Sequence, residues 1–103
     1  MELDKDVELL IKDIINVVSK SLRTPFELYL FGSFANTRAS RYSDVDIAIK
    51  TKDTLKEEDI VYLKEKLDDL RTLRKIDLVY LNKSPGLEDV VKKEGILIYE
   101  SKG

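Results

Sequence analysis

Asp44 and Asp46 stand one residue apart at the start of an apolar segment, a spacing that suits metal chemistry. Side chains alternate along a β-strand, so both carboxylates would point to the same face, with their Cα atoms roughly 7 Å apart. Two like charges that close repel each other, and a bound cation relieves the repulsion. The pattern therefore predicts a metal site on one face of a strand.

Asp77 is a third candidate ligand, near the start of a later apolar segment over residues 76–81. If that segment forms a strand parallel to the strand of Asp46, both strands begin at the same edge of the sheet. The three carboxylates would then converge on one point and could hold Mg²⁺ octahedrally, with positions left for water and phosphate oxygens. The chain has no cysteine and no histidine, so we expect Mg²⁺ or Mn²⁺ rather than zinc.

Gly32 and Ser33 follow the apolar segment over residues 26–31 and could bind phosphate. Glycine permits close approach of the backbone, and a helical turn that begins at Ser33 would offer N–H groups and a hydroxyl to an anion. An antiparallel pairing of the first two strands would bring these donors beside Asp44. Phosphate donors next to metal ligands suit phosphoryl-type transfer, which depends mainly on positioning and charge neutralisation.

Each feature taken alone also has an ordinary structural explanation. Gly32-Ser33 fits a turn after a strand, and Ser43-Asp44 fits a turn or an Asx cap. Asp77 alone fits a solvated residue at the start of a strand. The metal interpretation depends on all these features occurring together.

The elements that position these residues follow from the apolar periodicity. The helix over residues 54–73 begins with a capping box formed by Thr54 and Glu57. The short helix after it has Ser84 as its cap and Pro85 at its first position, and Gly95 closes it in the left-handed conformation. The predicted elements are helices over residues 4–21, 54–73 and 84–95, strands over 26–31, 45–49 and 76–81, and an edge strand over 96–99.

The order of these elements predicts the topology. The second and third strands flank a helix, so they should run parallel with a right-handed crossover. The segment between the first two strands is too short for a crossover helix, so we expect an antiparallel pair. The fold class is therefore α+β, with a small mixed sheet and helices packed on one face.

Length and composition exclude several classes of protein. The 103 residues suit a single domain over residues 1–103. The formal net charge is −2, which offers no general attraction to nucleic acid or to an anionic membrane. No apolar run reaches the length of a membrane span, and the acidic N-terminus lacks the apolar core of a signal peptide. We therefore expect a cytoplasmic protein.

The order Phe31-Gly32-Ser33, ten residues, then Asp44-Val45-Asp46-Ile47 resembles the signature of the DNA polymerase beta-like nucleotidyltransferase superfamily. The surrounding residues and the short chain are similar to its minimal nucleotidyltransferase (MNT) branch. Ile76-Asp77 stands where that family carries its third carboxylate. The resemblance covers about residues 26–99.

The resemblance implies roles for these residues. Asp44 and Asp46 would bind the metal, Asp77 would complete the site and help to activate the attacking hydroxyl, and Gly32 and Ser33 would hold the triphosphate. The hydroxyl would attack the α-phosphorus of a nucleoside triphosphate, expected to be ATP, and pyrophosphate would leave. Members of the branch often act as antitoxins that transfer AMP to a tyrosine of a helical HEPN partner. This implies such a partner here, with a homodimer as the alternative.

One departure from the family motif leaves a second function open. The family usually has a basic residue and then glycine after its Gly-Ser-x-Ala, whereas Asn36 and Thr37 stand there in this chain. The alternative is a non-catalytic nucleotide-binding or steric antitoxin subunit of a two-protein complex. A structural domain with an incidental acidic cluster is the third possibility, and in it Mg²⁺ would leave the melting temperature unchanged.

Overall fold

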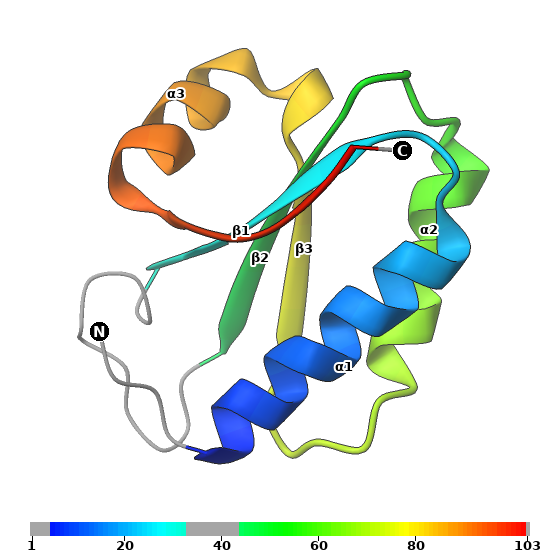
Figure 1. Ribbon diagram of the computed structural model, residues 1–103, viewed down its shortest axis with the longest axis vertical. Helices are drawn as coiled ribbons and strands as arrows, with labels where there is room; N and C mark the ends of the chain where they lie inside the picture. The colour runs from blue at the N-terminus through cyan, green and yellow to red at the C-terminus, as the bar shows by residue number, and fades with distance from the viewer. Residues whose placement is uncertain (1–4, 33–43, 103) are drawn as a thin grey trace.

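The computed structural model describes residues 5–32 and 44–102. Its helices and strands follow the predicted order, and a 3₁₀ turn, η2, follows the third strand (Figure 1). In chain order they are α1 (Lys5–Ser21), β1 (Phe26–Phe31), β2 (Val45–Thr51), α2 (Glu57–Asp68), β3 (Ile76–Tyr80), η2 (Leu81–Lys83), α3 (Pro85–Glu94) and β4 (Ile96–Ser101). Within the described residues, none of the helices is long and apolar enough to cross a membrane.

The four strands form one mixed sheet in the order β3-β2-β1-β4. Strands β2 and β3 run parallel and are connected through α2, while β1 is antiparallel to both β2 and β4. A parallel pair needs a long crossover, whereas antiparallel neighbours do not. Both predicted strand pairings are therefore confirmed, and β4 is an edge strand as expected.

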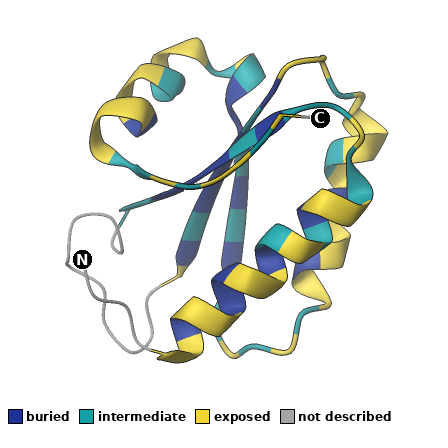
Figure 2. Ribbon diagram, viewed as in Figure 1, coloured by how far each residue is buried: buried dark blue, intermediate teal, exposed yellow. Residues whose placement is uncertain are grey.

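Helices α1 and α2 pack side by side against one face of the sheet (Figure 1). Figure 2 shows their buried residues on the sides turned toward the strands. The α1 residues that are buried recur at helical spacing, as an amphipathic helix requires: Val7, Leu10, Ile11, Ile14 and Val18. They meet the side chains of alternate strand positions, among them Leu28, Leu30, Val45, Ile47 and Ile49.

Helix α3 lies on the opposite side of the sheet from α1 and α2 (Figure 1). It forms a second, smaller apolar cluster, in which its residue Val91 packs with Tyr29, Ala48 and Leu81. The α+β class and the mixed sheet are confirmed. The prediction that the helices pack on one face of the sheet is correct for α1 and α2. Helix α3 departs from it because the alternation of side chains leaves Tyr29 and Ala48 on the other face, where they also need cover.

The predicted ends of α2 were wrong at both sides. Its N-cap is Lys56 rather than Thr54, and the Lys56 N–H donates to Oδ2 of Asp59 (3.1 Å). Just before the helix, the Leu55 N–H donates to the Tyr80 hydroxyl (2.9 Å). The helix ends at Asp68 rather than near residue 73. In the segment that follows, the Arg74 N–H donates to a threonine hydroxyl (3.1 Å), a local bond that competes with helix.

The ends of α3 also differ in part from the prediction. Pro85 opens the helix as expected, but the Ser84 hydroxyl makes no capping hydrogen bond. Gly95 is not left-handed: its φ of −84° and ψ of 176° are extended. Glycine is needed there for space, because a Cβ atom would lie 2.6 Å from the carbonyl oxygen of Val91 and 3.1 Å from that of Leu30.

Candidate functional site

Asp46 and Asp77 are direct partners on the neighbouring parallel strands β2 and β3. Val45 and Ile76, the residues before them, are also partners and point into the core that α1 and α2 cover. Because side chains alternate, the two carboxylates point to the opposite face. The structure therefore brings Asp46 and Asp77 together at the start of both strands, as the sequence predicted.

Asp44 immediately precedes β2 and is exposed to solvent. Its charge still acts on Asp46, because the pKa of Asp46 is raised above its ordinary value by burial, by Asp77 and by Asp44, in that order of size. We call Asp44, Asp46 and Asp77 the carboxylate cluster. Its members interact electrostatically, and repulsion between them is what a cation would relieve.

The carboxylate cluster does not form a ready-made cage for a metal. Among the residues that the structure describes, no group of three or more carboxylates has the spacing to hold one ion. The predicted convergence of three carboxylates on a single point is therefore not seen: Asp46 and Asp77 are strand partners, whereas Asp44 precedes β2 and is exposed. Mg²⁺ is usually held by one or two carboxylates together with waters and substrate phosphates, rather than by an all-protein cage. The Asp46–Asp77 pair fits that mode of binding.

Gly32 lies beside the carboxylate cluster at the end of β1. Its φ is +70°, the left-handed region that favours glycine, and the residue before it, Phe31, pairs with Asp46. A Cβ atom at position 32 would collide with Oδ2 of Asp46. Gly32 thus lies in close contact with the Asp46 carboxylate, while its predicted approach to a phosphate stays a prediction. Ser33, the other predicted phosphate ligand, lies outside the described residues together with Asn36 and Thr37.

Lys75 is a site residue that the sequence did not single out. Its Nζ lies 3.7 Å from Oδ1 of Asp77. Its backbone carbonyl accepts a hydrogen bond from the Val45 N–H (2.8 Å), which anchors Lys75 at the start of both parallel strands. Nothing in the sequence separates it from the other lysines. Only the register between β2 and β3 identifies it.

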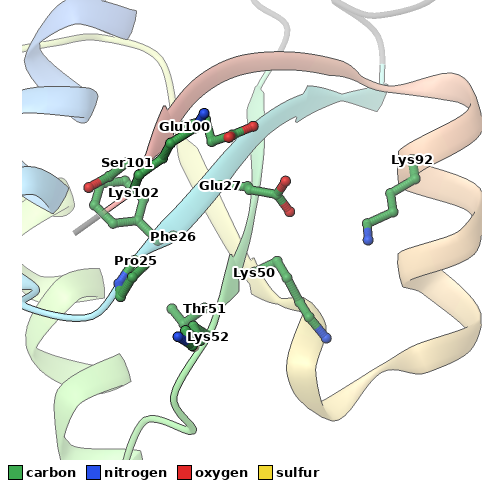
Figure 3. Close-up of a pocket in the computed structure, with 10 residues that line it drawn as sticks. All are labelled: Pro25, Phe26, Glu27, Lys50, Thr51, Lys52, Lys92, Glu100, Ser101 and Lys102. Carbon is green, nitrogen blue, oxygen red and sulfur yellow. The ribbon is translucent and has the colours of Figure 1, made fainter.

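A hollow of about 440 Å³ lies at the other end of the strands (Figure 3). Lys50 lines it from β2, four residues beyond Asp46 and thus roughly 13 Å further along the strand. Lys50 and Lys92 both bind Glu88, at 2.9 and 3.0 Å. Between the hollow and the carboxylate cluster, α3 covers the middle of this face. The hollow is therefore separate from the carboxylates. Its lining residues are Pro25, Phe26, Glu27, Lys50, Thr51, Lys52, Lys92, Glu100, Ser101 and Lys102.

Comparison with known proteins gives a family match over most of the chain. Residues 12–103 match the family model described as polymerase beta, nucleotidyltransferase. The chain belongs to this nucleotidyltransferase family. The match includes all three aspartates of the cluster as well as Gly32, and it confirms the family that the signature indicated. Comparison with curated proteins gave no match.

Several solved structures resemble this nucleotidyltransferase, among them chains of toxin–antitoxin complexes. One is from a toxin–antitoxin complex with AMP-PNP, with 30% identity, a TM-score of 0.73 and coverage of 85% of this chain and 71% of that chain. A second is from a tri-AMPylated Shewanella oneidensis HEPN toxin in complex with an MNT antitoxin, with 28% identity, a TM-score of 0.70 and coverage of 89% and 71%. A third is from the MntA–HepT complex, with 28% identity, a TM-score of 0.69 and coverage of 89% and 71%. These similarities support its place in the MNT branch.

Proposed function

We propose that this nucleotidyltransferase is metal-dependent and transfers AMP from ATP to a hydroxyl acceptor. The observation that carries the proposal is the pairing of Asp46 with Asp77 directly beside the backbone of Gly32. This arrangement puts two carboxylates and a close backbone approach at one edge of the sheet. Nucleotidyl transfer requires that combination, because phosphate charge must be neutralised where the chain holds the triphosphate.

Asp46 and Asp77, with Asp44 beside them, are the residues that would hold Mg²⁺ or Mn²⁺. The bound ion would neutralise charge on the phosphates and polarise the α-phosphorus. Burial and neighbouring carboxylates raise the pKa of Asp46, which means that its charged form lacks sufficient compensation in the chain alone. A cation at this position supplies that compensation.

The residues of the chain divide the remaining work between binding and proton transfer. Gly32 and Ser33 hold the triphosphate through backbone N–H groups and the serine hydroxyl. Asp77 accepts the proton of the acceptor hydroxyl while the oxygen of that hydroxyl forms a bond to the α-phosphorus. The bond from that phosphorus to the bridging oxygen breaks, and pyrophosphate leaves with the electron pair.

The acceptor proposed here is a tyrosine of a helical HEPN-type partner protein. The support comes from the similar structures, which include an AMPylated HEPN toxin bound to an MNT antitoxin and a toxin–antitoxin complex with AMP-PNP. In this role the chain is an antitoxin that modifies its toxin. A homodimer that completes the site is the alternative assembly.

The test is a labelling experiment on the chain purified with whatever protein it captures from its native host. Mg²⁺ and α-labelled ATP are added to the wild type, to Asp46→Asn and to Asp89→Asn, which makes the same change on the exposed surface of α3. We expect label on the partner with the wild type and with Asp89→Asn, and none with Asp46→Asn. Equal labelling by Asp46→Asn would exclude the proposed site.

A second function, a non-catalytic nucleotide-binding or steric antitoxin subunit, is favoured by one observation. Asn36 and Thr37 replace the basic residue and glycine that the family usually carries after its Gly-Ser-x-Ala. This function predicts that ATP binds with Mg²⁺ while no label is transferred. It also predicts that Asp46→Asn still neutralises the toxin in cells.

A further inference from the structure

We propose that Lys75 is a resident counter-ion of the carboxylate cluster, which the metal ion displaces when it binds, and that Lys75 thereby lowers the affinity of the site for free Mg²⁺. The inference rests on the proposed function, since it takes the carboxylate cluster as the metal site. It adds a residue that neither the family signature nor the strand pattern singles out.

The position of Lys75 is set by the backbone rather than by its flexible side chain. The Val45 N–H donates to the Lys75 carbonyl oxygen (2.8 Å), one residue before Val45 and Ile76 pair in the parallel register. The Cα atom of Lys75 is therefore held where both strands begin. From there its Nζ reaches within 3.7 Å of Oδ1 of Asp77.

The charges around Lys75 give it this role. The carboxylate cluster carries three acidic groups, and the charges of Asp77 and Asp44 both raise the pKa of Asp46. The other ion pairs found in residues 5–32 and 44–102 connect different residues: Lys50 and Lys92 with Glu88, Arg74 with Asp6, and Lys83 with Glu57. Among the ion pairs of these described residues, the pair of Lys75 with Asp77 is the one that involves the carboxylate cluster.

The ion pair of Lys75 and Asp77 is weak enough for a metal ion to replace the lysine. The Lys75 side chain is 72% exposed and that of Asp77 is 41% exposed. Ion pairs in contact with solvent are weak and are screened by salt. A dication that binds the carboxylate oxygen directly therefore outcompetes the ammonium, which moves into solvent. The ammonium nevertheless adds a positive charge close to the incoming metal, and this repulsion weakens metal binding.

The first experiment measures the affinity for Mg²⁺ alone, by calorimetry without nucleotide, on the full chain together with any protein that co-purifies. Lys75→Met removes the charge, Lys75→Arg keeps it, and Lys64→Met removes a charge from the exposed surface of α2, on the other face of the sheet. We expect Lys75→Met to bind Mg²⁺ roughly three- to tenfold more tightly, as removal of one screened charge predicts. Lys75→Arg and Lys64→Met should stay within about twofold of the wild type.

The second experiment compares unfolding temperatures in the absence of metal and tests whether Lys75 stabilises the carboxylate cluster there. In EDTA, Lys75→Met should unfold at a lower temperature than the wild type, because the carboxylates lose their compensating charge. Saturating Mg²⁺ should close this gap. The effect should also disappear when Lys75→Met is combined with Asp77→Asn, since the interaction between the two residues is then already absent.

The outcomes separate this inference from the proposed function. Wild type that binds Mg²⁺, with Lys75→Met binding equally or more weakly, overturns the counter-ion role and leaves the proposed function standing. Wild type that shows no Mg²⁺ binding without nucleotide overturns the counter-ion role, while the labelling experiment with Mg²⁺ and ATP tests the proposed function separately. Tighter binding by Lys75→Met and Lys64→Met alike would show a general charge effect and also overturn the inference.

Discussion

Gly32 and Asp46 are packed so closely that the Asp46 carboxylate occupies the space a side chain at position 32 would need. The contact crosses the antiparallel pair of β1 and β2, in which Phe31 is the partner of Asp46. The glycine therefore fixes where a carboxylate of the cluster can lie, in addition to any contact that its backbone makes with phosphate. This relationship can be tested apart from catalysis.

Gly32→Ala should destabilise the chain and weaken Mg²⁺ binding together. The φ of +70° strains any L side chain, and the new Cβ atom must push Asp46 away. We expect a loss of about 1–3 kcal/mol in the free energy of unfolding, measured by urea denaturation, and a lower Mg²⁺ affinity by calorimetry. Gly86→Ala is the matched control, because nothing lies within 4 Å of its Cβ position. Unchanged stability and affinity in Gly32→Ala would contradict the contact.

Asp46→Asn should stabilise the metal-free chain near neutral pH. The folded pKa of Asp46 lies above its ordinary value, so between the unfolded and folded pKa values the folded state binds more protons than the unfolded state. Stability contributed by this group therefore falls as pH rises through that window, and the ionised group is unfavourable above it. The gain from Asp46→Asn should shrink as pH falls through the folded pKa of Asp46 toward about 4, the ordinary pKa of an aspartate, and should be absent below that value. Thermal unfolding in EDTA across this range measures it, and a gain that grew toward low pH would contradict the prediction.

Glu88→Gln should destabilise the packing of α3 on the sheet, with the opposite dependence on pH. Hydrogen bonds from Lys50 and then from Lys92 lower the pKa of Glu88. The stability that it contributes is therefore present above the unfolded pKa and is lost as pH falls through the folded pKa. Urea denaturation near pH 7 should show a loss below about 1 kcal/mol, because the group is close to solvent. Glu94→Gln, an exposed change in the same helix, serves as the control. Equal effects of the two variants would refute the role of Glu88.

Tyr80→Phe should cost about 1–3 kcal/mol of unfolding free energy. The Thr51 hydroxyl donates to the Asp53 carbonyl oxygen (2.6 Å), so the Tyr80 hydroxyl donates to Oγ1 of Thr51 (3.0 Å) while it accepts from the Leu55 N–H (2.9 Å). Removal of the Tyr80 hydroxyl leaves the buried Thr51 oxygen without its donor and the Leu55 N–H without its acceptor. Urea denaturation followed by circular dichroism measures the loss.

Tyr99→Phe provides the matched control for Tyr80→Phe. It removes the same hydroxyl from an exposed residue and leaves the ring to pack against Phe26, whose centroid is 5.6 Å away. We expect a change within about 0.5 kcal/mol. A loss as large as that of Tyr80→Phe would mean that the buried hydrogen bonds are not the cause.

The sequence by itself determined the elements of the fold and the family. Apolar residues at a period of 3.6 or 2 identify α1 and the strands, because these periods arise from local backbone geometry. The same alternation places Asp46 on the side of β2 away from Val45. The signature from Phe31 to Ile47 is a run of residues read along the chain, so it indicated the nucleotidyltransferase family without knowledge of any contact.

The tertiary structure decided where those elements end and which distant residues meet. Helix α2 begins at Glu57, and just before it the Leu55 N–H donates to the hydroxyl of Tyr80, 25 residues later in the chain. Gly95 is required by the carbonyl oxygens of Val91 and Leu30 rather than by its own backbone conformation. Lys75 joins the carboxylate cluster through the register of two parallel strands. Such contacts depend on how separate segments pack, and no local pattern of residue types carries that information.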